Sequence, residues 1–492
     1  MITDTNRASS KIYDVCVIGA GAAGITIALE LAKAKINVLL CEGGYDEYSE
    51  ESQALYEGKV VADPELDVMY SRLRYFGGTT NHWGGYCRPL DEYDFTECSF
   101  DSSIPSWPIN KAALSKYLGE ACKILEIKNN FKDQALGGYF KQADFKLSGP
   151  VRFKAKYLDV LKKSKYCELL FNANLFSLET AGKYIQEAVF KTDKNKVFKI
   201  KSKFYVLATG GMENSRLLLW SNKLSGGRII RNIDTLGKYW MSHPHFDLGN
   251  ILMWGEKDPL PDGLVNYAPT KDFLDRNKIM NITLRVDPIL RADPVEGGVG
   301  ALTVPLHDKD QTNEKIAIEI FKIAPFLAQG LLESGYKIFV RQLLGVWEQV
   351  PDANNKIILS EKHDRLGMPT LELHWRKKKS EYGAAKTTAF EFAKFIAVNN
   401  LGRVKLSDWL INEEDPPVDG KEHLYGHHLG GTRMSTSPSS GIVDENCKLF
   451  DQSNMYVVGG SVFPRGGHAN PTLTIVQLSL RLAHHLIEKI NA

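Results

Sequence analysis

A short apolar stretch near the N-terminus runs straight into three closely spaced glycines. Residues 12–18 have the pattern of a buried strand, residues 24–33 repeat apolar side chains at helical spacing, and residues 38–41 are a second apolar strand. A strand, a helix and a second strand in this order begin a βαβ unit. The pattern therefore predicts an α/β fold with a Rossmann-like, dinucleotide-binding domain.

The glycines at the end of the first strand follow the pattern GxGxxG. Gly19 permits a tight turn, Gly21 lets a pyrophosphate approach the backbone, and Gly24 allows the helix to pack closely on the strand. The start of the helix presents free N–H groups to the phosphates. Glu42, after the second strand, can accept hydrogen bonds from both ribose hydroxyls. The expected cradle consists of Gly19, Gly21, Ala22, Ala23, Gly24 and Glu42.

A second glycine turn favours FAD over NAD as the dinucleotide. Residues 205–211 have the pattern of a strand that enters the turn Ala208-Thr209-Gly210-Gly211. In flavoproteins with this organisation, such a segment returns beneath the dinucleotide. We therefore expect FAD as the cofactor, with Ala208 and Gly210 in contact with it.

Composition and charge exclude several classes of protein. The 492 residues carry a formal net charge of +2, which gives no argument for a nucleic-acid partner, and the basic run 376–379 is typical of a solvated face. The cysteines form no CxxC pair, so neither a zinc site nor a disulfide framework is expected. Residues 1–10 lack the apolar core of a secretory signal, and no stretch has the roughly 18 apolar residues of a membrane span. We expect a cytoplasmic protein without a membrane span.

The composition divides the chain into a discontinuous cofactor domain and an inserted domain. In the inserted part, Pro, Gly and aromatic residues are scattered among short strands, and helical spacing appears near 314–345 and 381–400. This pattern predicts a substrate domain built on an antiparallel sheet with helices. The expected parts are a first FAD-binding part at 11–245 with a cofactor loop at 70–95, a substrate domain at 246–424, and a second FAD-binding part at 425–492.

Five motifs make the prediction more specific. They are the GxGxxG turn, Gly77-Gly78-Thr79-Thr80-Asn81-His82-Trp83, Ala208-Thr209-Gly210-Gly211, His428-Leu429-Gly430-Gly431-Thr432 and Ala469-Asn470-Pro471-Thr472-Leu473-Thr474. With these motifs in this order, the chain resembles the glucose–methanol–choline (GMC) oxidoreductases. The end of the last motif, Asn470-Pro471-Thr472-Leu473-Thr474, resembles that of the pyranose oxidase and sugar or cyclitol dehydrogenase branch of the family. Residues 246–424, which would choose the substrate, contribute little to the resemblance.

The resemblance implies a catalytic pair, His428 and Asn470. An imidazole suits removal of a hydroxyl proton because its pKa lies near the operating pH, and the amide of Asn470 can donate to the developing alkoxide. The adjacent His427 is the competing base. Neighbours in an extended segment point to opposite sides, so only one of the two histidines can face the flavin.

The resemblance also implies which residues surround the flavin. His82 aligns with the position that carries a covalent flavin bond in some relatives, and packing of the loop on the ring without such a bond is the favoured alternative. The start of the last helix would stabilise negative charge on the reduced ring. Beside the cradle, the expected cofactor contacts are Gly78, Thr79, Asn81, His82, Trp83, Ala208, Gly210, Gly460, Asn470, Pro471 and Thr472.

Several other polar residues are candidates for the site. Arg465 either binds a carboxylate or phosphate of an acidic sugar, or points to solvent or to a backbone carbonyl. His468 could share a face with Asn470, and a structural or substrate-binding role is expected for it rather than that of the base. His243 and His245 flank a proline without a further ligand cluster, so we expect no metal.

The expected function is oxidation of a CH–OH group of a sugar, amino sugar or cyclitol to a carbonyl, with the hydride passing to the flavin. Oxidation of a sterol or aliphatic alcohol is the first alternative, because the segment 314–345 is rich in large apolar residues. That segment could instead be an oligomer surface or a lid. A flavin-binding protein without turnover is the alternative of another class. The sequence leaves open whether oxygen is the electron acceptor and whether the protein forms an oligomer.

Overall fold

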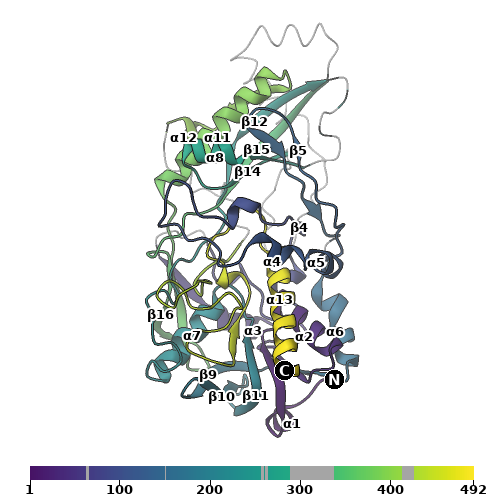
Figure 1. Cartoon of the computed structure of the whole chain (residues 1–492), viewed down its shortest axis with the longest axis vertical. Helices are drawn as coiled ribbons and strands as arrows, with labels where there is room; N and C mark the ends of the chain where they lie inside the picture. The colour runs from purple at the N-terminus through teal and green to yellow at the C-terminus, as the bar shows by residue number, and fades with distance from the viewer. Residues whose placement is uncertain are drawn as a thin grey trace.

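The computed structural model describes residues 1–61, 66–149, 151–255, 257, 260, 264–288, 337–412 and 426–492. These residues form two sheets of seven strands toward opposite ends of the molecule, with helices around them (Figure 1). The predicted α/β class, with a Rossmann-like domain and a second domain on an antiparallel sheet, is confirmed.

The first sheet contains the N-terminal βαβ unit and lies toward the lower end in Figure 1. Its parallel part runs in the order β8, β2, β1, β11, β19, and β11 also pairs with β10, which pairs with β9, both antiparallel. The strands are β1 Ile12–Ile18, β2 Val38–Cys41, β8 Cys167–Leu170, β9 Asn174–Ala181, β10 Tyr184–Lys191, β11 Val197–Leu207 and β19 Met455–Val457. Because β19 comes from the last part of the chain, distant segments share one sheet.

Two long helices lie beside this sheet. Helix α2 (Ala22–Lys33) follows β1 after the glycine turn and packs against α13 (Thr472–Asn491), as Figure 1 also shows. On α13, Leu473, Val476 and Leu480 recur at helical spacing and are buried. Burying each such side chain stabilises the fold by about 1.5–3 kcal/mol. This packing holds the starts of α2 and α13 in the wall of one cavity.

The second sheet is antiparallel throughout and lies toward the upper end in Figure 1. In spatial order its strands are β18 Gly402–Leu406, β12 His245–Gly255, β15 Lys337–Trp347, β14 Ile282–Pro288, β13 Val265–Pro269, β6 Phe140–Gln142 and β5 Gln134–Ala135. Helix α11 (Lys379–Val398) packs in the same apolar core through Ala385, Ala389, Phe392 and Ile396. The helix predicted near 381–400 is therefore confirmed.

Part of a predicted helix is a strand. Residues 337–345, which were expected to continue a helix from residue 314, belong to β15, so that part of the prediction is wrong; residues 314–336 lie outside the described residues. Strand β15 pairs with β12 on one side and β14 on the other, and Val340, Leu343 and Leu344 are buried. A strand covered on both faces reads as an almost continuous apolar run, which mimics a buried helix.

Short stretches cross the expected domain limits. Strands β5 and β6 precede residue 246 but belong to the second sheet. Conversely, β16 (Lys356–His363) and β17 (Pro369–His374) form a small sheet with β3 (Gly58–Val61), and β16 packs on α7 (Glu213–Leu224). The division of the chain at residues 245 and 425 stays a proposal. In it, β5 and β6 belong with the second sheet, and β16 and β17 belong with the first domain.

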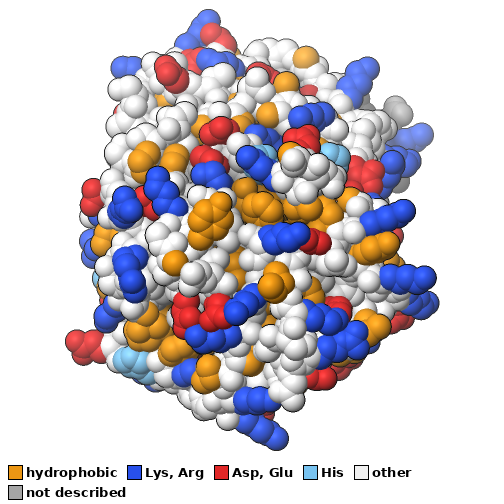
Figure 2. All heavy atoms as spheres, turned by 60° about the horizontal axis from the view of Figure 1, so that its bottom comes forward, with side chains coloured by type: hydrophobic (Ala, Val, Ile, Leu, Met, Phe, Trp, Pro, Cys, Tyr) orange, Lys and Arg blue, Asp and Glu red, His pale blue; other side chains and the backbone are white. Residues whose placement is uncertain are grey.

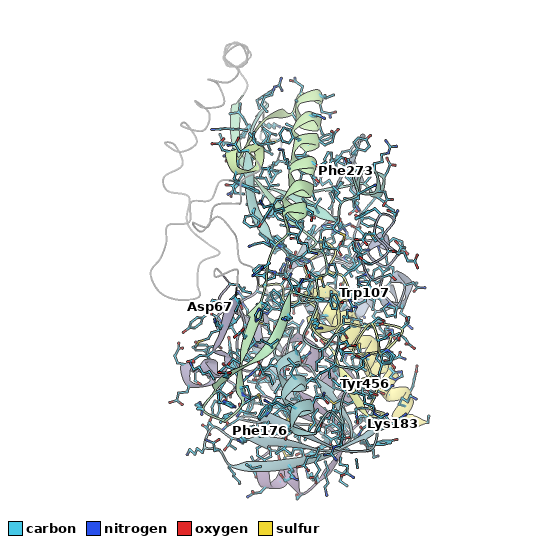
Figure 3. The ribbon with its side chains drawn as sticks, turned by 90° about the vertical axis from the view of Figure 1, so that its left-hand side faces the viewer. Asp67, Trp107, Phe176, Lys183, Phe273 and Tyr456 are labelled. Carbon is cyan, nitrogen blue, oxygen red and sulfur yellow. The ribbon has the colours of Figure 1, made fainter. Side chains whose placement is uncertain are left out.

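The apolar core is divided in the same way as the sheets. Trp107 and Tyr456 belong to the largest cluster and Phe273 to the cluster of the second sheet, and Figure 3 shows Phe273 above and Tyr456 below Trp107. On the face seen in Figure 2, basic and acidic side chains are interspersed. That face therefore lacks the one-sided positive charge of a nucleic-acid surface.

None of the helices in the described ranges is long and apolar enough to cross a membrane.

Candidate active site

The glycine turn after β1 has the geometry that its sequence predicts. Gly19 has φ +103°, and a Cβ there would be 2.6 Å from the carbonyl oxygen of Ala208. A Cβ on Gly24 would be 1.9 Å from the carbonyl oxygen of Gly19. A Cβ on Gly21, in contrast, would meet no heavy atom within 4 Å apart from its chain neighbours, and Gly21 lines a cavity. Packing thus requires two of the glycines, and the third leaves space for a ligand.

Glu42 stands at the rim of the same cavity. Its two carboxylate oxygens accept hydrogen bonds from the backbone N–H groups of Ala20, at 2.9 Å, and Gly44, at 2.8 Å. These bonds fix the carboxylate after β2, and each oxygen can still accept a further hydrogen bond. The position suits recognition of ribose hydroxyls.

One cavity of about 790 Å³ extends from this cradle to the C-terminal motifs. Its volume is within the usual range for ligand sites in proteins. The predicted cofactor and catalytic residues in its wall are Gly19, Gly21, Ala22, Ala23, Glu42, Gly78, Thr79, His82, Trp83, Ala208, Gly210, His428, Gly460, Asn470, Pro471 and Thr472. Two distant ends of the chain therefore meet at one site.

The loop around His82 is held by its own side chains. Asn81 donates to the carbonyl of Phe76 at 2.8 Å and accepts from the N–H of Lys154 at 3.0 Å. Asn81 was expected at the cofactor, but it braces the loop from behind and is absent from the described cavity wall. Trp83 donates to the carbonyl of Val151 at 2.7 Å, and His82 Nε2 is 2.9 Å from the Tyr75 hydroxyl.

The two neighbouring histidines of the C-terminal motif point in different directions. Nε2 of His427 is 3.2 Å from Nδ2 of Asn470. The ring of His428 packs instead against Trp240 at 5.8 Å between centroids, and its Nε2 makes no hydrogen bond to the described residues. The expected pair of His428 and Asn470 is thus not brought together by these contacts. His427, the alternative base, is the partner of Asn470.

Backbone packing explains why the segment takes this orientation. A Cβ on Gly211 or on Gly460 would lie 2.2 Å from the carbonyl oxygen of His428. The backbone of His428 is therefore held between two glycine turns, and its side chain follows from that position. The sequence analysis chose His428 over His427 as the residue that faces the site; in the structure both line the cavity, and the contact with Asn470 is made by His427.

Both histidines are neutral at ordinary pH. Burial lowers the pKa of His427 well below 6.5, and the neighbouring His243, His245 and His428 lower it further. Burial and the charge of Arg72 lower the pKa of His428 to about 3. A neutral imidazole keeps one bare nitrogen, so His427 can accept a proton.

Arg465 does not face the cavity and is corrected as a substrate-binding candidate. Its guanidinium is buried and paired with Glu348, with Nε to Oε1 and Nη2 to Oε2 both at 3.1 Å. It also donates to the carbonyl of Thr96 at 3.4 Å. Because Glu348 already neutralises it in the interior, the contacts of Arg465 favour a structural role over the binding of a substrate anion.

His468 lines the cavity but has both ring nitrogens engaged by the protein. Nε2 is 3.0 Å from Asp91 Oδ2, and Nδ1 makes a close contact with Thr283 Oγ1. Burial acts to raise the pKa of Asp91, but the hydrogen bond from His468 and the charge of Arg88 outweigh it and hold that pKa well below its usual value. His468 therefore stiffens the wall next to Asn470.

Comparison with known proteins identifies the family. Residues 351–479 match the family model described as GMC oxidoreductase, and residues 14–212 match the model described as FAD dependent oxidoreductase. These ranges contain the cradle, the His427 segment and Asn470. The chain belongs to the GMC oxidoreductase family.

Relatives of this GMC oxidoreductase differ in their named substrates. The large subunit of fructose dehydrogenase from Gluconobacter japonicus is 24% identical over 69% of this chain, and the match spans only 57% of that subunit. The 2-methyl-1,2-propanediol dehydrogenase from Mycolicibacterium austroafricanum is 22% identical over 98% of this chain and 96% of its own length. The crystal structure of pyridoxine 4-oxidase from Mesorbium loti has a TM-score of 0.59 at 15% identity, covering 96% of this chain and 99% of that one.

FAD is the cofactor of this GMC oxidoreductase, and the residues in the cavity fit it. Cβ positions on Gly21 and Gly210 would project into open space within the cavity wall. The start of α13 follows Pro471 in the cavity wall and, from Thr472 onward, offers backbone N–H groups to an electron-rich ring. A covalent link through His82 stays a prediction.

Sequence reasoning missed the polar residues that the second sheet contributes. Thr283, Arg285 and Asp287 alternate with buried Ile282, Leu284 and Val286 along β14, and the three polar residues line the cavity. This period of two is the signal that could have found them. Nε of Arg285 is 2.8 Å from Oδ2 of Asp287.

Replacing Gly21 by valine is expected to weaken FAD binding at least about tenfold, or about 1.4 kcal/mol. Its backbone φ of −86° is allowed for any residue, and the added side chain would fill the space left for the pyrophosphate. The flavin-to-protein absorbance ratio after dialysis measures the effect. Gly19→Val is the contrasting variant, because its Cβ would strike Ala208 and it should reduce folded protein instead. A fully flavinated Gly21→Val protein would contradict the cradle.

Proposed function

We propose that this enzyme oxidises a CH–OH group of a sugar, amino sugar or cyclitol to a carbonyl, with His427 as the base. The observation that supports this most is the 3.2 Å approach of His427 Nε2 to Asn470 Nδ2, in the wall of the cavity that also contains the dinucleotide cradle. A bare imidazole nitrogen and an amide donor at one point are suited to hold a hydroxyl group from both sides.

The two side chains would divide the work on the substrate oxygen. The hydroxyl would replace the amide at His427 Nε2 and donate its hydrogen bond there, while Asn470 Nδ2 donates to the hydroxyl oxygen. When the hydroxyl proton moves to Nε2, negative charge grows on the oxygen and strengthens the hydrogen bond from Asn470. FAD, when bound, supplies the acceptor for the hydride that leaves the carbon. The alcohol thereby loses one proton and one hydride and becomes a carbonyl.

A polyol is favoured by the polar wall opposite the cradle. Asn266, Thr283 and the Arg285–Asp287 pair offer donors and acceptors for several hydroxyl groups. The named substrate of the fructose dehydrogenase relative points the same way. A small aliphatic alcohol, as in the name of the propanediol dehydrogenase relative, or a sterol has fewer hydroxyl groups to hydrogen-bond to this polar wall.

The test is anaerobic bleaching of the flavin absorbance with a panel of sugars, amino sugars, cyclitols, diols and sterols. We expect bleaching by a cyclic polyol and recovery of the absorbance when an acceptor, such as oxygen, is supplied. Bleaching by an aliphatic diol or a sterol alone would overturn the substrate class but keep the chemistry. A bound flavin that no alcohol of the panel reduces would favour the binding protein without turnover.

A further inference from the structure

A second buried imidazole lies directly behind His427. Nδ1 of His243 is 2.9 Å from Nδ1 of His427, and the two rings are almost perpendicular, with centroids 5.0 Å apart. Only 4% of His243 is exposed. From the sequence, no metal was expected at His243 and His245 and a structural or cavity-edge role was preferred; the contact with His427 suggests a more specific use for His243.

The backbone sets this contact. Met241 and Leu429 form an antiparallel bridge, with each N–H donating to the other residue's carbonyl at 2.8 and 3.0 Å. His243 comes two residues after Met241, and His427 comes two residues before Leu429. The two histidines therefore lie opposite each other on the same face. His245 Nδ1 is 2.6 Å from the carbonyl oxygen of His243, which tightens the turn around Pro244.

The position of the proton on each ring shows that His427 donates the hydrogen bond and His243 accepts it. The amide nitrogen of Asn470 can only donate, so Nε2 of His427 accepts and the proton of that neutral ring is on Nδ1. This Nδ1–H then donates to Nδ1 of His243, whose own proton must be on Nε2. Nε2 of His243 is buried and has no hydrogen-bond partner among the described residues, so the contact with His427 is the hydrogen bond that assigns the proton of His243.

We propose that His243 is a positioning residue that holds His427 in the tautomer whose bare Nε2 faces the substrate. The inference rests on the proposed function of His427 as a base. After the hydroxyl proton arrives on Nε2, His427 is an imidazolium, and its Nδ1–H continues to donate to His243. No second proton transfer is needed, and His243 stabilises the new charge by accepting a stronger hydrogen bond.

The surroundings keep His243 neutral and therefore able to accept. Burial lowers its pKa to about 4, against the charge of Glu348, and His468 lowers it further. The titratable groups that act on His427 are His243, His245 and His428, and all are imidazoles. No carboxylate of the described residues is among the groups that shift the pKa of His427, so the imidazole of His243 has the orienting role that an acid has in many catalytic sites.

The proposal is tested on FAD-loaded protein labelled with ¹⁵N-histidine, by NMR of the imidazole nitrogens, with the His427 signals assigned from a His427→Leu sample. In the wild type we expect the proton of His427 on Nδ1. In His243→Leu the acceptor is lost and the Nε2–H tautomer should gain population. In His243→Asn, the side-chain oxygen replaces the acceptor at Nδ1 and the wild-type tautomer should return.

Kinetics provide the second readout. The limiting rate of flavin reduction should fall about 10- to 100-fold in His243→Leu, the usual effect of losing a group that orients a functional ligand, with rescue in His243→Asn. A wild-type His427 protonated on Nε2, or equal rates and tautomers in all three proteins, would overturn the proposal. The NMR result does not require turnover, so failure of the proposed alcohol oxidation is distinguishable from failure of this inference. Where a variant does not fold, the wild-type spectrum alone still shows which nitrogen of His427 carries the proton.

Discussion

Replacing His427 by leucine is expected to slow reduction of the flavin by the best alcohol substrate about 10²- to 10⁴-fold, the usual contribution of a general base. Leucine fills much of the space of the imidazole but removes the bare Nε2 beside Asn470. The hydroxyl proton then has no acceptor in the described wall at that point. Anaerobic stopped-flow measurement of the flavin absorbance gives the rate directly, and the flavin content of each sample is measured first.

The matched control is the same change at the next residue. His428→Leu should slow flavin reduction by less than about tenfold, or about 1.4 kcal/mol in the barrier. The ring of His428 packs against Trp240, and its Nε2 has no hydrogen bond within the described chain, so an apolar side chain can replace it. If His428→Leu slowed flavin reduction more than His427→Leu, His428 would be the base.

The pH dependence of the wild-type enzyme gives an independent check of the base. Because burial lowers the pKa of His427, the ring stays neutral and active below pH 6.5. The acidic limb of kcat/KM should therefore lie below that value, as it reports the free enzyme. An acidic limb above pH 6.5 would contradict a buried imidazole as the base.

The dinucleotide cradle was predictable because local physics determines it. Gly19 is required by its φ of +103° and Gly24 by its approach to the carbonyl of Gly19, and Glu42 is fixed by two nearby backbone N–H groups. Such short-range requirements leave a pattern in consecutive residues. The fold class and a dinucleotide cofactor follow from that pattern, and both agree with the structure and the family.

The catalytic end could be predicted only in part, because its decisive contacts are long-range. Choosing between His427 and His428 requires the bridge between Met241 and Leu429, which no local pattern shows. Strand β15 was predicted as part of a helix because both of its faces are buried, which removes the period of two from its sequence. Arg465 is the clearest case, because its partner lies more than a hundred residues earlier in the chain.

Arg465 and Glu348 form a buried ion pair in which both side chains are charged. Burial acts to raise the pKa of Glu348, but Arg465 outweighs it and holds that pKa below its ordinary value. Both groups are therefore charged, and their side chains are 6% and 0% exposed. An unpaired charge at such a position is costly, because water cannot reach it and no other counter-charge replaces the lost one at equal distance.

Removing one partner of this pair is expected to destabilise the enzyme by about 3–5 kcal/mol, the usual cost of leaving a buried charge alone. Glu348→Gln strands the guanidinium, and Arg465→Met strands the carboxylate. Denaturant unfolding of FAD-loaded protein measures each loss, and the double variant should lose less than the two single losses added together, since it buries no uncompensated charge. The Michaelis constant of the folded Arg465→Met protein should stay near the wild-type value, because Arg465 faces away from the cavity. A raised Michaelis constant without a loss of stability would instead support the original hypothesis of an anion-binding arginine.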